Sequence, residues 1–232
     1  MTQPATTLPP ALAALAAAGT AAVSDALDLA GVKGQLWGPQ RLSGSGVVVG
    51  PAFTVTLEPV AEGERAPAAD YLDEVPPGSV VVLAGSKAVC TVWGDILSEI
   101  ATARGIAGTV VDGLCRDIDR IRELRYSVWA HGAFMRSGKN RVRMTATQQP
   151  VVLGRDSEAR TVRPGDIVCA DGSGVTLVPL ARLAEIAETV ERIGAMEELV
   201  LRDVRAGMAL RDARVKHGYN RMALRTADGG DR

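Results

Sequence analysis

Two apolar runs on either side of a helix-like segment constrain the fold more than any other feature of this sequence. Residues Ser79 to Ala84 read Ser-Val-Val-Val-Leu-Ala, and residues Ile106 to Val111 form a second run of the same kind. Such uninterrupted runs are typical of strands whose two faces are both covered. Between them, apolar residues recur at helical spacing after Asp95, which is placed to cap that helix. These residues are Ile96, Leu97, Ile100 and Ala101.

The pattern then repeats further along the chain. Residues Asp117 to Leu124 have the apolar spacing of a short helix, and Tyr126 to Ala130 follow as a third strand. The order strand, helix, strand, helix, strand predicts an α/β fold whose βαβ core contains a largely parallel sheet.

The flanking segments complete the expected fold. Val47–Val49 and Phe53–Leu57 predict a strand pair or one bent strand, and Ile167–Ala170 and Val175–Val178 predict a hairpin. From Leu183 to Met208 the period becomes helical, with an interruption at Gly194. We expect a single domain over residues 1–232, in which the tail of about 180–232 is a long helical segment that packs on a neighbouring subunit.

Composition narrows the class of function. The chain has 26 basic and 27 acidic residues and only eight aromatic residues, so nucleic acid is not an expected partner. Cys90, Cys115 and Cys169 lie far apart, which predicts core residues in a reducing compartment. The alanine-rich run Ala11–Val23 has no preceding Lys or Arg and is too short to span a bilayer. We therefore expect an ordinary helix closed by Ser24-Asp25, no membrane association and a cytoplasmic location.

The pairs Gly94-Asp95 and Arg116-Asp117 are the candidate site. Both fall at strand-to-helix junctions on the same sheet edge, where open α/β sheets hold their ligands. The free backbone amides at the helix start, Ile96 and Leu97, can bind a carboxylate, and the Arg116 guanidinium can donate two further hydrogen bonds to the same carboxylate. Asp117 can offer a hard oxygen to Mg²⁺ or Mn²⁺. The spacing alone equally allows a turn and an N-cap beside a solvated helix face.

Other motifs carry less information. With two histidines, His131 and His217, the chain lacks the motifs of histidine-rich metal sites and of a standard catalytic triad. Gly44-Ser45-Gly46 does not match the dinucleotide fingerprint and opens no predicted helix, and Gly138-Lys139-Asn140 lacks the remaining features of a phosphate loop. We interpret both as turns.

Two longer stretches resemble the signature of the RraA-like family. The first runs from Gly94 through Glu99 and then from Gly105 to Asp117, and the second comprises Val162–Val168 with Asp171–Val175. The likeness spans about residues 24–179, and Asp95 followed after twenty residues by Arg116-Asp117 is its most specific part. The family includes 4-hydroxy-4-methyl-2-oxoglutarate and 4-carboxy-4-hydroxy-2-oxoadipate aldolases, and also proteins named as inhibitors of ribonuclease E activity.

The resemblance implies a fold like a swivelling phosphohistidine domain, assembled as homotrimers or pairs of trimers with active sites between subunits. It implies that Arg116 contacts pyruvate, that Asp117 holds the metal and that the amides near Gly94, Asp95, Ile96 and Leu97 bind the pyruvate carboxylate. It also implies an acidic residue of the adjacent subunit that supports the metal through water, and Glu197 or Glu198 could match it.

These roles predict a divalent-metal-dependent lyase that cleaves a 4-hydroxy-2-oxo acid into pyruvate and a second carbonyl compound. The metal would stabilise the enolate, Arg116 would add positive charge, and a water oriented by the metal or by Asp95 would take the C4 hydroxyl proton. The same chemistry predicts oxaloacetate decarboxylation as a side activity.

Three alternatives remain open at this point. A Schiff-base mechanism would use Lys87, which follows a predicted strand. A non-catalytic regulator resembling the ribonuclease E inhibitors would bind an RNA-processing enzyme. A methyltransferase, a label that some family members carry, finds no support because no glycine-rich nucleotide loop is present.

Two further groups of side chains could face the site. His131 follows the third strand, although a polar strand-end residue explains it as well. A basic cluster could hold a distal carboxylate of the substrate or form a solvated loop. It comprises Arg136, Lys139, Arg141 and Arg143.

Overall fold

The computed structural model describes residues 8–61, 70–85 and 89–219. The helices are α1 (Pro10–Leu29), α2 (Asp95–Ala103), α3 (Ile118–Leu124), α4 (Leu183–Arg205) and α5 (Leu210–His217), with 3-10 turns η1 (Asp70–Glu74), η2 (Asp156–Glu158) and η3 (Leu180–Arg182). The strands are β1 (Gln35–Leu36), β2 (Gln40–Ser43), β3 (Val48–Pro59), β4 (Val80–Ala84), β5 (Thr91–Trp93), β6 (Gly108–Cys115), β7 (Val128–Ala133), β8 (Val142–Thr147), β9 (Val151–Leu153), β10 (Arg160–Val162), β11 (Ile167–Ala170) and β12 (Val175–Val178).

The predicted βαβ core is confirmed, and it forms the centre of a larger mixed sheet. Strands β3, β4, β6 and β7 are neighbours and run parallel, and β5 also pairs in parallel with β6. Antiparallel strands extend the sheet on both sides, through β11, β12 and β1 beyond β3 and through β2 beyond β7. The segment expected as a strand pair or one bent strand is the single strand β3, and the predicted β11–β12 hairpin is present.

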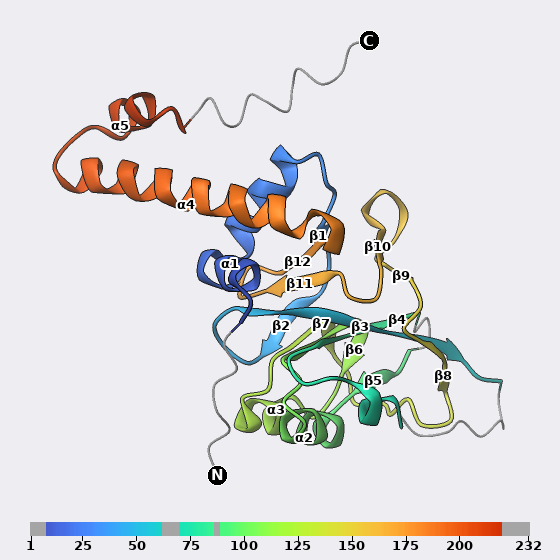
Figure 1. The fold of residues 1–232 in the computed structure, drawn as a ribbon. Helices are drawn as coiled ribbons and strands as arrows, with labels where there is room; N and C mark the ends of the chain where they lie inside the picture. Colours follow the sequence, from blue (N-terminus) through green and yellow to red (C-terminus); the bar gives the residue numbers. More distant parts are fainter. Residues whose placement is uncertain (1–7, 62–69, 86–88, 220–232) are drawn as a thin grey trace.

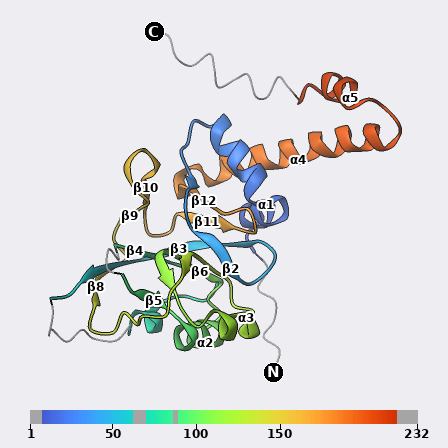
Figure 2. The same ribbon diagram turned by 180° about the vertical axis from the view of Figure 1, so that it is seen from behind.

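Helices cover the sheet in two separate layers (Figures 1 and 2). Helices α2 and α3 lie under the parallel strands, while α1 and α4 pack against each other above the β11–β12 part of the sheet. The β4 strand is buried along its whole length, which explains its uninterrupted apolar sequence. The three cysteines are also buried, as expected.

The N-terminal helix is longer than the sequence indicated. It does not close at Ser24-Asp25 but continues to Leu29, with a kink at Gly19, where φ is 79°. By length and composition α1 is the one helix among the described residues that could cross a membrane. In this fold, however, Leu15, Val23 and Leu27 are fully buried in a core shared with α4 and β11.

A single carboxylate holds this kink. Asp171, in the turn between β11 and β12, accepts hydrogen bonds from the Thr20 amide (2.9 Å) and the Thr20 hydroxyl (2.7 Å), and also from the Ser173 amide (2.7 Å). Asp171 therefore serves as the cap for the second half of α1, although the two segments are 151 residues apart.

The C-terminal helix does not break where the sequence suggested. Gly194 lies inside α4, which continues to Arg205, and the chain turns at Gly207 (φ 95°) into the separate helix α5. The N-terminal half of α4 packs on α1, whereas its C-terminal half projects from the body of the molecule (Figure 1). Leu201 is exposed on that projecting half. The expected packing of this tail on a neighbouring subunit stays a prediction.

The Asp171 cap predicts a pH-dependent contribution to stability. Burial raises the Asp171 pKa, but the hydrogen bonds from Thr20, Ser173 and Gly174 outweigh that effect, so the pKa is lowered. The stabilisation is therefore present above the unfolded-state pKa near 4 and is lost as pH falls through the lower folded-state pKa. At pH 7, Asp171→Asn should cost roughly 1–2 kcal/mol, seen as a melting temperature lower by about 2–8 °C.

The difference in melting temperature between Asp171→Asn and the parent should be smaller at pH 3 than at pH 7, because the parent carboxylate becomes increasingly protonated as the pH falls toward its lowered pKa. Glu191→Gln, an exposed charge change on α4, serves as the control and should leave the melting temperature unchanged at both pH values. An equal difference between parent and Asp171→Asn at pH 7 and pH 3 would contradict this account.

Candidate functional site

Two strand-to-helix junctions meet at one edge of the sheet, as the sequence predicted. Strand β5 ends at Trp93 just before α2, and β6 ends at Cys115 just before α3. The Arg116 amide donates a hydrogen bond to the Trp93 carbonyl oxygen at 3.0 Å, which joins the two junctions directly. This bond brings Asp95 close to Arg116 and Asp117.

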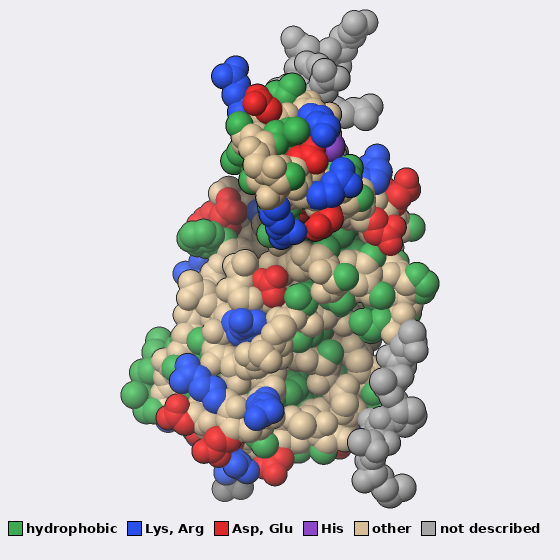
Figure 3. All heavy atoms as spheres, turned by 90° about the vertical axis from the view of Figure 1, so that its left-hand side faces the viewer, with side chains coloured by type: hydrophobic (Ala, Val, Ile, Leu, Met, Phe, Trp, Pro, Cys, Tyr) green, Lys and Arg blue, Asp and Glu red, His purple; other side chains and the backbone are tan. Residues whose placement is uncertain are grey.

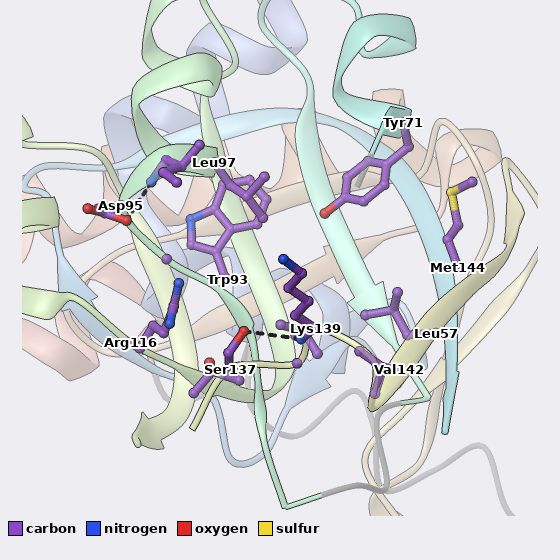
Figure 4. A pocket seen from close by; sticks show the side chains of 15 residues that line it. Leu57, Tyr71, Trp93, Asp95, Leu97, Arg116, Ser137, Lys139, Val142 and Met144 are labelled. Carbon is purple, nitrogen blue, oxygen red and sulfur yellow. Dashed lines mark hydrogen bonds between the residues drawn. The ribbon is translucent and has the colours of Figure 1, made fainter. Parts of the chain in front are cut away.

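The junctions form one wall of a cavity of about 400 Å³ (Figure 4). Asp95 and Arg116 lie on one side of it, Tyr71, Leu57 and Met144 on the other, and Lys139 between them. A pocket of this size is in the range that small-molecule ligands occupy. The lining residues are Leu57, Tyr71, Thr91, Val92, Trp93, Gly94, Asp95, Ile96, Leu97, Arg116, Ser137, Gly138, Lys139, Val142 and Met144.

The start of α2 differs from the expected cap. Gly94 is the N-cap residue and Asp95 is the first helical residue, so the prediction that Asp95 caps the helix was wrong. The Asp95 carboxylate instead accepts a hydrogen bond from the Ile96 amide at 2.8 Å, and the Asp95 amide donates to Asp117 Oδ2 at 3.4 Å. Two amides at the helix start thus already have carboxylate acceptors, which marks this end of the cavity as anion-binding.

Asp117 adopts an unusual backbone conformation. It is the N-cap of α3, but its φ of 57° and ψ of 35° are left-handed, and its side chain makes no capping hydrogen bond. Its Oδ2 atom lies 3.2 Å from Arg116 Nε instead. Left-handed non-glycine residues are costly and concentrate at functional sites. Asp117 therefore does not cap α3 through its side chain, which was the alternative that the spacing alone allowed.

The donor set at this edge is compatible with a weakly held hard cation. Asp117 and Asp95 supply carboxylate oxygens, and Mg²⁺ is commonly bound by one or two carboxylates with water completing its shell. The described residues contain no group of three or more His, Cys, Asp or Glu that could hold a metal. The residues present therefore fit an ion that keeps most of its waters.

A buried polar pair supports the start of α2. Trp93 Nε1 donates to Ser98 Oγ at 2.8 Å, and the Ser98 hydroxyl donates to the Gly94 carbonyl oxygen at 2.9 Å. The Trp93 ring also stacks on Tyr126 with centroids 6.0 Å apart. Every polar atom in this series of hydrogen bonds has a partner, so the bonds hold Gly94 and the start of α2 in place.

On the far side of the cavity, Tyr71 was not predicted from the sequence, whereas Lys139 belongs to the basic cluster that was expected either to hold a distal carboxylate or to form a solvated loop. Tyr71 from η1 is only 2% exposed, and its hydroxyl points into the cavity (Figure 4). Burial, with a smaller contribution from Tyr126, raises the Tyr71 pKa, so this phenol stays neutral and can donate a hydrogen bond. Lys139, interpreted above as part of a turn, also lines the cavity, and its amide donates to Ser137 Oγ at 3.1 Å.

The other candidates lie elsewhere. His131 contacts Asp112, with Nε2 2.6 Å from Oδ1, and neither residue lines the cavity. No local pattern indicated this pair. Glu198 lies on the projecting part of α4, 3.6 Å from Arg205, so any role in a neighbouring subunit stays a prediction. Lys87 lies outside the described residues. Of the basic cluster, Lys139 alone lines the cavity; Arg136, Arg141 and Arg143 do not.

Cys115 lies directly beside the site, but its thiol is unreactive. Its thiol is fully buried and donates a hydrogen bond to the Arg116 carbonyl oxygen at 3.4 Å. Burial raises the Cys115 pKa to about 12; a backbone hydrogen bond from Arg116 lowers the pKa to a smaller extent, and Asp117 raises it slightly further. A neutral buried thiol is neither a nucleophile nor a metal ligand. This agrees with the expected core role of the cysteines.

Comparison with known proteins identifies relatives along most of the chain. Protein DlpA of Legionella pneumophila is 38% identical over 216 residues, which is 92% of this chain but 34% of that protein. This chain therefore spans about a third of the length of that relative. A protein of Halalkalibacterium halodurans named "Putative 4-hydroxy-4-methyl-2-oxoglutarate aldolase" is 31% identical over 181 residues, covering 77% of this chain and 81% of that protein.

Solved structures show the same fold. An uncharacterized protein from Pseudomonas syringae pv. tomato has a TM-score of 0.79 and 38% identity, covering 88% of this chain and 96% of that one. RraAS2 of Streptomyces coelicolor, described as an unusual member of the RNase ES inhibitor RraA protein family, has a TM-score of 0.72 and 30% identity, covering 83% and 96%. The family model described as RraA-like, Aldolase/RraA, matches residues 20–177, and the chain belongs to this family.

Proposed function

We propose that this protein is a divalent-metal-dependent aldolase that cleaves a 4-hydroxy-2-oxo acid to pyruvate and a second carbonyl compound. The observation that carries the proposal is the placement of Arg116 and Asp117 against the start of α2 at one end of a ligand-sized cavity. The relatives named as aldolases support the same reaction class. Decarboxylation of oxaloacetate is the expected side activity.

The amides of Ile96 and Leu97 would bind the carboxylate of the substrate, with Arg116 beside them. Without substrate, the Asp95 carboxylate accepts the Ile96 amide hydrogen. A substrate carboxylate that takes this position would displace the Asp95 side chain toward the reacting carbons. Asp95 could then orient the water that removes the C4 hydroxyl proton as the C3–C4 bond breaks.

Asp117 would hold the divalent ion, Mg²⁺ or Mn²⁺, and Glu198 of a neighbouring subunit could support it through water. When bound, the ion supplies Lewis-acid stabilisation of negative charge on the 2-oxo oxygen. Arg116, 3.2 Å from Asp117, would add positive charge at the same place and keep the Asp117 carboxylate oriented.

The far side of the cavity would hold the substituent on C4. Leu57, Val142 and Met144 form an apolar wall there, while Lys139 and the Tyr71 hydroxyl provide two polar contacts. This combination suits a substituent that carries both alkyl and carboxylate groups. A substrate with a second carboxylate on C4 therefore fits the lining better than one with an alkyl group alone.

The proposal also includes a cellular location and an assembly. We expect a cytoplasmic homotrimer or dimer of trimers over the single domain 1–232.

A regulator that binds an RNA-processing enzyme is the second candidate function, because RraAS2 is described as belonging to a family of RNase ES inhibitors. The two candidates differ in turnover, since a regulator would release no pyruvate from any 2-oxo acid.

Removing the proposed metal ligand should abolish turnover. Asp117→Ala should lower the rate of pyruvate release from 4-hydroxy-4-methyl-2-oxoglutarate at saturating Mg²⁺ by at least about 100-fold, because several kcal/mol of charge stabilisation are lost. Chelator treatment of the parent should reduce the rate similarly, and added Mg²⁺ or Mn²⁺ should restore it. A coupled assay for pyruvate measures both.

Asp119→Ala is the matched control, because Asp119 is a highly exposed carboxylate two residues further along the same loop and helix. Its rate should stay within about twofold of the parent. Full activity of either Asp117→Ala or chelator-treated protein would refute the metal mechanism.

Gly94 should be essential for activity although its backbone conformation is an ordinary one. A Cβ at this position would lie 2.8 Å from Asp117 Oδ2 and 3.2 Å from Arg116 Cγ. Gly94→Ala should therefore push Asp117 away from the Asp95 amide and lower kcat at least about tenfold, with a melting temperature close to that of the parent. Gly194→Ala, inside α4 at a position where a Cβ meets nothing within 4 Å, should keep the parental kcat. Unchanged kcat in Gly94→Ala would show that this contact is not needed.

Lys139 should select substrates that carry a second carboxylate. Lys139→Met retains an unbranched side chain but removes the charge, so kcat/KM for 4-hydroxy-4-methyl-2-oxoglutarate should fall about tenfold or more. For 4-hydroxy-2-oxopentanoate, which has only a methyl group at C4, kcat/KM should change less than threefold. Lys33→Met, on an exposed turn, is the control. Equal losses for both substrates would assign Lys139 another role.

A further inference from the structure

A second hollow, of about 340 Å³, lies at the opposite end of α3 from the candidate site. Three arginines and no carboxylate line it. Figure 3 looks onto the side of the molecule that carries α3 and the β2–β3 loop, and the lower half of that face carries several basic side chains, with acidic side chains along its bottom edge. The lining residues are Arg41, Leu42, Ser43, Gly44, Ser45, Arg122 and Arg125.

The charges of these arginines are poorly compensated within the described residues. Arg122 has a single acidic partner, Asp119, at 3.6 Å, and both side chains are largely exposed. Arg41 donates to the Gly46 carbonyl oxygen at 3.0 Å, and Arg122 Nε donates to the Leu42 carbonyl oxygen at 3.1 Å. These bonds position the guanidinium groups of Arg41 and Arg122 but do not neutralise their charges. Positive charge is therefore concentrated around the hollow, although the net charge of the whole chain is only −1.

Three polar groups of the lining strand and loop have no hydrogen-bond partner among the described residues. Ser43 is 5% exposed, and its hydroxyl has no hydrogen-bond partner. The amides of Gly44 and Ser45 donate no backbone hydrogen bond among those of the described residues. Gly44 and Gly46 both have left-handed φ values, 87° and 70°, and loops of this kind can turn successive amides toward an anion. The Gly44-Ser45-Gly46 turn, which matched no nucleotide fingerprint, thus lies beside three guanidinium groups.

Arg125 occupies a position where glycine would be unstrained. It is the C-cap of α3 with φ 55° and ψ 22°, and helices usually place glycine in this left-handed conformation. Arg125 also lines the hollow. An arginine here carries a backbone strain that glycine would not, and such strained residues concentrate at functional sites.

We propose that this hollow binds a phosphate group, either free or carried by a small metabolite. The fork geometry of guanidinium groups matches phosphate oxygens, and hydroxyl and amide donors can complete their hydrogen bonding. The C-terminal end of α3 carries a partial negative charge, but three full positive charges outweigh it. The volume and the small net charge of the chain favour a small ligand over a nucleic acid.

Isothermal titration calorimetry at constant ionic strength tests the site, with inorganic phosphate, glycerol 3-phosphate and malonate as probes. We expect saturable binding of at least one phosphate probe and binding of malonate at least tenfold weaker. Tighter binding of the ester would indicate a phosphorylated metabolite, and equal or tighter binding of inorganic phosphate would indicate the free ion. If Arg116→Ala still binds phosphate with the parental affinity, the phosphate site lies outside the cavity that Arg116 lines.

Arg125→Gly is the decisive variant, because glycine relieves the left-handed strain while removing the charge. Its melting temperature should equal or exceed that of the parent, and its phosphate affinity should fall at least tenfold. Arg211→Ala, which removes an exposed arginine from α5, should leave phosphate affinity unchanged. The proposal is overturned if the parent shows no saturable phosphate binding, if malonate binds equally well, if Arg116→Ala abolishes binding, or if Arg125→Gly binds as the parent does.

Discussion

The candidate site depends on one backbone hydrogen bond, from the Arg116 amide to the Trp93 carbonyl oxygen. It joins the end of β5 to the end of β6, so that α2 and α3 start side by side. Because parallel strands present their carboxyl ends at one edge, the residues after both strands reach the same cavity. The Trp93–Ser98–Gly94 contacts then fix the first turn of α2 against this edge.

The central topology and the proximity of Asp95 to Arg116-Asp117 could be predicted because their signals are local. The apolar run of β4 reflects its complete burial, and the alternation of strands and helices defines the parallel order. Asp95 and Arg116-Asp117 directly follow predicted strands, so their approach required only the topology. The family resemblance added the roles that spacing left open.

The remaining features depend on contacts between distant segments, which periodicity does not reveal. The extension of α1 past Ser24-Asp25 relies on a kink that Asp171 holds from 151 residues away. Tyr71 reaches the cavity from η1 through tertiary packing alone. Asp95 has a side chain suited to capping, yet Gly94 takes the N-cap position because a Cβ there would meet Asp117. In that case a tertiary contact overrides a local preference.

The same tertiary contacts organise charge around α3. At its start, Asp117 and Asp95 accept hydrogen bonds from the amides that open α2, and Arg116 balances Asp117. Negative side chains therefore occupy positions in which backbone amides could also bind an external carboxylate. Near the end of the same seven-residue helix, Arg122 and Arg125 line a hollow without a carboxylate. The helix thus separates a region whose anion-binding groups already have carboxylate partners from a region whose three positive charges are only partly compensated, by Asp119.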